Sequence, residues 1–180
     1  PHMTNSSYAK ELEVAKAIAK EAGEIALKYF DADQQVERKA DKSSVTIADK
    51  EINSLVIQRL SEAFPEDGVV GEEESTAEYG MGRKWICDPI DGTAGYIWGT
   101  PTSMFSLALV IDGKPVIGVA FVPFMQNMYI GEKNQPSTCI NREGQEKPIH
   151  VSEKTLADGI MGVHGNVKAM MKAPYFPKLS

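Results

Sequence analysis

The chain has 180 residues, of which 42% are hydrophobic and 24% charged, which is enough for one globular domain with a sizeable core. Its formal net charge of -6 gives no sign of a basic surface for nucleic-acid phosphates, so we do not expect a nucleic-acid partner. The sequence has no long apolar run that would span a membrane and no basic start followed by an apolar stretch, so we expect a cytoplasmic protein without membrane contact.

Two helices are predicted in the first third of the chain. Residues 1–3, Pro-His-Met, are interpreted as a cloning remnant. From Ser7 to Phe30 apolar residues recur every three or four positions, which predicts an amphipathic helix with Ser7 as its N-cap. The same period predicts a second helix from Ala48 to Phe64, ended by Pro65.

Strands are predicted after Pro65, where the sequence changes to β-branched and apolar runs. Asp112-Gly113 between two of these runs is a strong hairpin signal, so much of the sheet should be antiparallel. The predicted fold class is therefore α+β, with two long helices packed on a mostly antiparallel sheet. The runs are Val69–Val70, Trp85–Cys87, Met104–Ile111, Pro115–Val122 and Met128–Ile130.

Cysteine and histidine are too sparse for several kinds of site. Cys87 and Cys139 are isolated in the sequence, and Cys87 ends an apolar run, which favours a buried free thiol. Beyond the first three residues only His150 and His164 remain, without the spacing of a zinc site. A serine or cysteine hydrolase would also need an imidazole base. Any metal should therefore be hard and bound through oxygen.

Acidic residues follow two predicted strands. Glu72, Glu73 and Glu74 come after the first, and Asp88 and Asp91 come after the second. Each segment alone is more often a solvated loop or a turn. However, the fold does not require a second carboxylate three residues after the one that ends a buried-looking strand. We expect both segments to face one cleft, where grouped carboxylates would suit Mg²⁺ or Mn²⁺.

An anion site is predicted next to these carboxylates. Gly92 and Thr93 follow Asp91 at what looks like a helix start, where free backbone N–H groups and the helix dipole favour an anion. A metal site beside an anion site suggests phosphate chemistry.

The run from Asp88 to Thr93, Asp-Pro-Ile-Asp-Gly-Thr, resembles the signature of the inositol monophosphatase family, a lithium-sensitive group of phosphomonoesterases. Three further segments resemble the family, and with the signature they cover most of the chain. Lys39 to Asp49 is similar to the segment before its second helix, Gly71-Glu72-Glu73 to its Gly-Glu-Glu loop, and Gly113 to Pro123 to its hairpin.

The resemblance implies a ligand set for two Mg²⁺ ions, with Mn²⁺ as a substitute. Glu72, Asp88 and the Ile90 carbonyl would hold one ion, and Asp88 and Asp91 the second. Two such cations stabilise both the attacking and the leaving oxygen of an in-line displacement.

The resemblance also implies residues for phosphate binding and for the attack of water. Thr93, with the backbone amides of Gly92 and Thr93, would bind the phosphate. Glu72, or the pair of Asp49 and Thr93, would orient the attacking water. The implied function is Mg²⁺-dependent hydrolysis of a small phosphate monoester resembling inositol 1-phosphate.

Three alternatives stay open beside this function: a histidinol-phosphate phosphatase, a 3'-phosphoadenosine 5'-phosphate phosphatase, and a metal-binding fragment without turnover. After Thr93 the family often has a polar or bulky residue and then an Asn or a small residue before an aromatic, whereas here Ala94 and Gly95 precede Tyr96, so the identity of the substrate is left open. A haloacid-dehalogenase-type enzyme needs two aspartates with the spacing Asp-x-Asp. It is disfavoured because two residues, not one, separate Asp88 from Asp91. A Nudix-type enzyme is disfavoured because Glu72–Glu74 follow a strand.

Family members run well beyond this length, and a later Trp-Asp motif of theirs has no counterpart after Pro174. We therefore expect an amino-terminal metal-binding domain at 4–163 and the start of a shortened carboxy-terminal region at 164–180. The implied architecture is layered and sugar-phosphatase-like, lacking its carboxy-terminal α/β part. Exposed apolar surface would then favour a homodimer.

Overall fold

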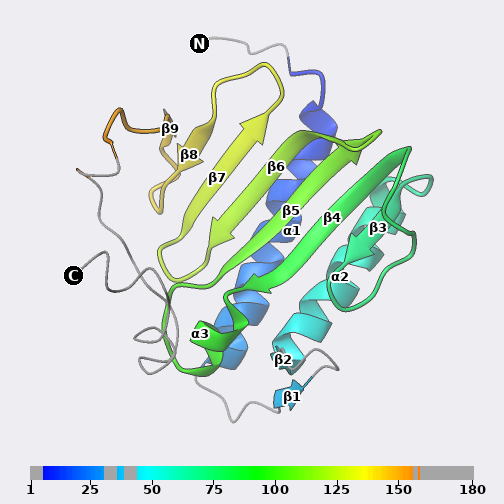
Figure 1. The fold of residues 1–180 in the computed structure, drawn as a ribbon, viewed down its shortest axis with the longest axis vertical. Helices are drawn as coiled ribbons and strands as arrows, with labels where there is room; N and C mark the ends of the chain where they lie inside the picture. The colour runs from blue at the N-terminus through cyan, green and yellow to red at the C-terminus, as the bar shows by residue number, and fades with distance from the viewer. Residues whose placement is uncertain (1–5, 31–35, 39–43, 156–157, 159–180) are drawn as a thin grey trace. The chain divides into compact units, whose positions relative to one another are not determined.

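Two long helices lie on one face of a seven-stranded sheet in the computed structural model (Figure 1). The structure describes residues 6–30, 36–38, 44–155 and 158. The chain divides into two compact units, residues 1–150 and 151–180, and the helices and strands below belong to the first. In the second, the Thr155 backbone N–H and hydroxyl donate to the Asp158 carboxylate. The predicted cloning remnant and the predicted boundary at 163/164 lie outside the described residues.

The first helix, α1 (Ala9–Phe30), places small residues and Ile18 against the sheet. Its predicted N-cap is wrong: the helix begins at Ala9, and in the preceding turn the Ser6 hydroxyl, rather than that of Ser7, accepts from the Tyr8 N–H at 3.2 Å. The predicted period is nevertheless confirmed, because its apolar positions face the core. Ala15, Ile18, Ala19, Ala22 and Ala26 are buried, and Leu12, Ile25 and Tyr29 are partly buried against the core.

The second helix, α2 (Ile47–Ala63), ends just before Pro65 as predicted, with Phe64 as its C-cap. It begins at Ile47 because Thr46 and Asp49 form a capping box, in which each side chain bonds the other residue's backbone N–H. Before it, β1 (Val36–Arg38) and β2 (Ser44–Thr46) form a short antiparallel pair that the sequence did not predict.

The large sheet has the strand order β3-β4-β5-β6-β7-β8-β9. All of its neighbouring pairs are antiparallel except β3 and β4, which run parallel. The mostly antiparallel α+β fold is thus confirmed. The predicted Asp112-Gly113 hairpin is also confirmed, with φ of 50° and 74° at its two residues. The strands are β3 (Gly68–Gly71), β4 (Arg83–Asp91), β5 (Met104–Ile111), β6 (Lys114–Val122), β7 (Asn127–Glu132), β8 (Thr138–Ile140) and β9 (Glu146–Pro148).

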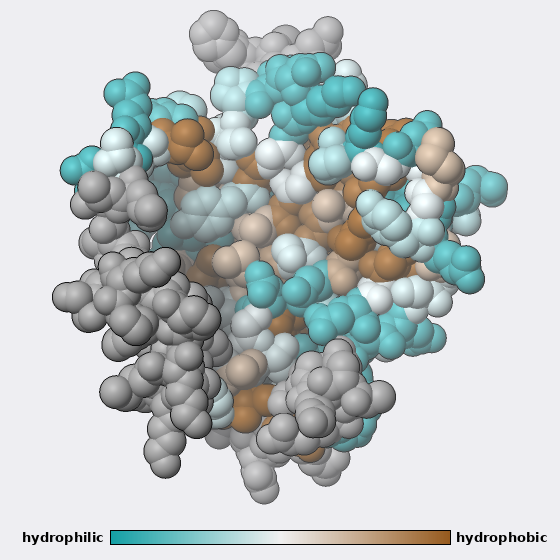
Figure 2. Space-filling view, viewed as in Figure 1, coloured by the Kyte–Doolittle hydropathy of each residue, from teal (hydrophilic) through white to brown (hydrophobic). Residues whose placement is uncertain are grey.

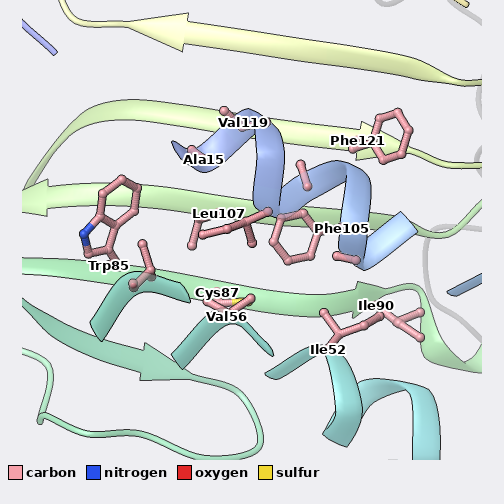
Figure 3. Close-up of a cluster of buried hydrophobic side chains, with 14 of the residues drawn as sticks. Ala15, Ile52, Val56, Trp85, Cys87, Ile90, Phe105, Leu107, Val119 and Phe121 are labelled. Carbon is pink, nitrogen blue, oxygen red and sulfur yellow. The ribbon is translucent and has the colours of Figure 1, made fainter. Parts of the chain in front are cut away.

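The core lies between the helices and the sheet, and Figure 3 shows Ile52 and Val56 of α2 facing Cys87 and Ile90 of β4. Cys87 is a buried free thiol, as predicted, and burial raises its pKa. The short helix α3 (Thr93–Ile97) is attached to α1 because the Tyr96 hydroxyl donates to the Ala26 carbonyl at 2.6 Å.

The opposite face of the sheet carries small side chains, including Ser106, Ala108, Gly118 and Ala120. They leave a shallow hollow of about 470 Å³ over β4 to β7, and Figure 2 shows hydrophobic residues in brown on this side. Asp88 is one of the residues that line this hollow. Among the described residues, no helix is long and apolar enough to cross a membrane.

Candidate active site

The parallel pairing of β3 and β4 brings the two acidic segments together at the carboxyl ends of these strands. Gly71 is paired with Cys87, so Glu72 and Asp88 are the next residues of two adjacent strands that run in the same direction. Their carboxylates interact, since the negative charge of Glu72 contributes to the pKa of Asp88. In an antiparallel pair, the carboxyl ends of the two strands would lie at opposite ends of the sheet.

Asp88 carries an unusual buried oxygen. Its Oδ1 is shielded from solvent and has no hydrogen-bond partner among the described residues. Burial, followed by the charges of Glu72 and Asp91, raises the pKa of Asp88 from 3.8 to about 7. Buried carboxylate oxygens almost always have a partner, so this oxygen is a candidate ligand for a cation.

Asp49 lies at the start of α2 and is 1% exposed. Its Oδ2 accepts from the Thr46 backbone N–H at 2.7 Å and from the Thr46 hydroxyl at 2.6 Å. Its Oδ1 faces the Thr93 hydroxyl at 3.5 Å. Burial raises the pKa of Asp49, the Thr46 hydrogen bonds oppose that shift, and the charges of Glu73 and Glu72 add to it. The cap thus fixes one oxygen and leaves the other facing Thr93.

Thr93 begins α3 directly after β4, where the strand pairing is interrupted. The register with β5 shifts between Asp88 and Asp91, a bulge of the kind common next to active sites. Gly92 then has a φ of 90°, which favours glycine, and turns the chain into the helix. The Thr93 hydroxyl donates to the Ile90 carbonyl at 2.9 Å, so it lies between that carbonyl and Asp49.

The loop after β3 exposes Glu72 and Glu74 and half buries Glu73. Asn53 of α2 bonds its backbone: Nδ2 donates to the Glu74 carbonyl at 3.0 Å, and Oδ1 accepts from the Glu73 N–H at 3.3 Å. The sequence interpretation missed Asn53. Its position one helical turn after Asp49, on a face that is otherwise apolar, was the available signal.

The residues present fit a hard divalent cation by their chemistry. The candidate ligands, Glu72, Asp88, Asp91 and the Ile90 carbonyl, offer oxygen alone, and the buried Asp88 Oδ1 accepts no hydrogen bond from any residue that the structure describes. Within the described ranges, however, no three His, Cys, Asp or Glu side chains lie close enough together to hold one ion. A bound ion would therefore depend on the backbone carbonyl and on water to complete its shell.

A model of the inositol monophosphatase family matches residues 7–173 of the chain. Among curated relatives, the chain is 39% identical over 124 residues to a histidinol-phosphatase of Chlorobaculum parvum, covering 68% of this chain and 48% of the relative. It is 34% identical over 148 residues to an inositol monophosphatase of Mesembryanthemum crystallinum, covering 79% and 53%.

Solved structures show the same fold. The extragenic suppressor protein SuhB of Bartonella henselae superposes with a TM-score of 0.71 at 27% identity, covering 79% of this chain and 55% of that one. An IMPase of Thermotoga maritima gives a TM-score of 0.71 at 26% identity, covering 79% and 54%. The chain thus spans about half the length of the relatives that it matches.

Proposed function

The chain belongs to the inositol monophosphatase family, and from this premise we propose that it carries the metal-binding part of a phosphatase. The proposed reaction is the Mg²⁺-dependent hydrolysis of a small phosphate monoester. Its single strongest support is the buried Asp88 Oδ1, an acceptor without a hydrogen-bond partner among the described residues, at a position where the sequence resemblance implies a cation ligand.

In this proposal Glu72, Asp88 and the Ile90 carbonyl would hold one Mg²⁺, and Asp88 and Asp91 would hold a second. Bound Mg²⁺ would neutralise phosphate charge and lower the pKa of water. Asp88 contributes to both sites, and the charges that raise its pKa come from the other two carboxylates, Glu72 and Asp91. A cation among them would remove this repulsion.

Asp49 and Thr93 are proposed to orient the attacking water and to receive its proton. The Thr93 hydroxyl can pass a proton toward Asp49 Oδ1, 3.5 Å away, while the Thr46 cap holds the carboxylate in place. The raised pKa of Asp49 makes it a stronger base than an exposed aspartate, which favours this pair over Glu72 for the role. The Gly92 and Thr93 amides are proposed to bind the phosphate oxygens.

Two substrates are proposed. Inositol monophosphate follows from the family and from relatives such as the plant enzyme above. Histidinol phosphate is the second candidate, because two relatives at 39% identity are histidinol-phosphatases. Mn²⁺ is proposed as a substitute cation. Lithium sensitivity, a homodimer and a cytoplasmic location stay predictions.

Mg²⁺ binding is the first test, because its proposed ligands all lie in the described chain. Isothermal titration calorimetry should give a saturable Mg²⁺ signal for this chain. Phosphate release from inositol 1-phosphate and histidinol phosphate, with Mg²⁺ or with EDTA, then ranks the substrates. A chain that binds no Mg²⁺ at millimolar concentration would contradict the proposal.

A further inference from the structure

One side chain of α2 contacts the acidic loop on both sides of Glu72. Asn53 is 1% exposed, and its amide donates to the Glu74 carbonyl and accepts from the Glu73 N–H. It therefore pairs with the loop backbone through one donor and one acceptor, as a neighbouring strand would. Hydrogen bonds formed away from water are strong electrostatically and costly to lose.

Gly71 provides the contact on the other side of Glu72. A Cβ added to Gly71 would lie 2.1 Å from Asn53 Oδ1 and 2.4 Å from the Glu74 carbonyl oxygen. Those distances are far inside van der Waals contact, so no side chain fits at this position unless the loop moves. Glu72 thus lies between a residue packed on Asn53 and a residue hydrogen-bonded to it.

The helix that carries Asn53 also carries Asp49. The two residues are four positions apart, so they lie on the same face of α2, and each is 1% exposed. The capping box of Thr46 and Asp49 fixes where the helix begins. One rigid element therefore sets the position of Asp49 and of the loop that bears Glu72.

We infer that Asn53 is a positioning residue for the metal site: it fixes the backbone on both sides of Glu72 and so holds that carboxylate ready beside Asp88. The inference rests on the proposed function, because it takes Glu72 as a metal ligand. Asn53 touches neither the cation nor the substrate in this role. A ligand on a loop that is already ordered loses less conformational freedom when the ion binds.

Calorimetric Mg²⁺ titration of Asn53→Ala tests this role. Residues that act from outside the ligand shell typically change metal affinity by about 10- to 100-fold, and we expect Kd to rise within that range. Asn141→Ala is the matched control, since Asn141 Oδ1 also accepts from two backbone N–H groups, those of Glu143 and Gln145, at the far edge of the sheet. Its Kd should stay within about twofold of the unsubstituted chain.

A second variant keeps the test decisive if Asn53→Ala folds poorly. Gly71→Ala should push the loop off Asn53 and also raise the Kd for Mg²⁺. Combining Gly71→Ala with Asn53→Ala should give less than the product of the two separate changes, because both act partly through one contact. Unchanged Kd values in both single variants, or fully multiplicative effects, would overturn the inference.

Amide hydrogen exchange at Glu73, measured without metal, separates the positioning role of Asn53 from the proposed metal-dependent function. Asn53→Ala should speed exchange there, whatever the cation does. Faster exchange with an unchanged Kd would overturn the positioning role and leave the proposed function intact. If the unsubstituted chain binds no Mg²⁺, the proposed function fails and this inference fails with it.

Discussion

At the scale of single residues, Asp88 differs from every other candidate ligand because the proposal assigns it to both cations. Asp88→Asn keeps the shape of the side chain and removes the charge that would let two dications lie close together. We expect Mg²⁺ affinity to fall by more than about 100-fold, beyond the usual effect of residues outside the ligand shell. Calorimetry measures this, with Glu74→Gln as the control that should resemble the unsubstituted chain, because Glu74 is exposed and has no assigned ligand role.

Thr93→Ala should have an intermediate effect. The carboxylates remain, so Mg²⁺ should still bind, but the hydroxyl between the Ile90 carbonyl and Asp49 is lost. In an active form we expect a loss of about 3 kcal/mol of transition-state stabilisation, by analogy with the loss of one preorganised donor. Steady-state kinetics should show this in kcat. A Thr93→Ala variant with unchanged kcat would remove the hydroxyl from the reaction.

The pKa of Asp88 also predicts how stability depends on pH without metal. Its value of about 7 in the folded chain exceeds the ordinary 3.8, so the folded state holds the proton more tightly. The resulting stabilisation is complete below about pH 4 and is lost as pH rises through 7. After a discount for solvent, we expect about 1–2 kcal/mol less unfolding free energy at pH 8 than at pH 5 from this group.

Urea denaturation in EDTA at the two pH values measures that difference. Asp88→Asn should flatten the dependence, and it should make the metal-free protein relatively more stable at pH 8. An equal slope in the variant would assign the dependence to another group, of which Asp49 is the first to test because its pKa is also raised.

The proximity of the candidate ligands was predictable from the sequence, but the contact that Asn53 makes with their loop was not. Glu72, Asp88 and Asp91 stood out because hard-cation chemistry needs grouped carboxylates, and the structure places them at one sheet edge. Their catalytic roles stay predictions. Asn53 was missed because its partners are backbone groups of a loop about 20 residues away, and such pairing leaves little trace in local sequence.

At the scale of elements, the capping box both starts α2 and holds the Asp49 carboxylate in the candidate site. Thr46→Ala removes the hydroxyl that caps α2 and bonds Asp49 Oδ2. We expect a loss of about 1–2 kcal/mol of unfolding free energy, the usual range for a lost N-cap. Thr46→Ser should retain most of it. Chemical denaturation compares the three proteins, and equal stability of the alanine variant would show that the cap is not needed.

Helices and hairpins were predictable from local pattern, and strand direction was not. The apolar period located α1 and α2 to within two residues at each end, and Asp112-Gly113 located the β5–β6 turn. The parallel pairing of β3 with β4 was missed because it depends on how the chain returns after Gly71, which no short motif encodes. The β1–β2 pair was missed because three-residue strands have no measurable period.

At the scale of the whole molecule, a cation that binds the folded state alone should stabilise it by mass action. At about 100 times its Kd, Mg²⁺ should add about 2.7 kcal/mol, which raises the Tm of a protein this size by about 5–10 °C. Thermal unfolding with Mg²⁺, with EDTA and with Zn²⁺ tests this, and Zn²⁺ should not be required. An unchanged Tm after chelation would contradict the metal assignment.

The parallel edge of the sheet has one more consequence, for local unfolding. β3 has four residues and pairs with one strand, β4, through the parallel ladder, which is slightly the weaker kind per residue. On its other side, Val69 and Val70 bond residues 75–77 of the loop that follows. Such edges open at a lower free energy than a central meander like β4–β7. Opening there would part Glu72 from Asp88 while the helices stayed packed on the remaining strands. We therefore expect this edge to open without global unfolding, and we expect cation binding to slow that opening.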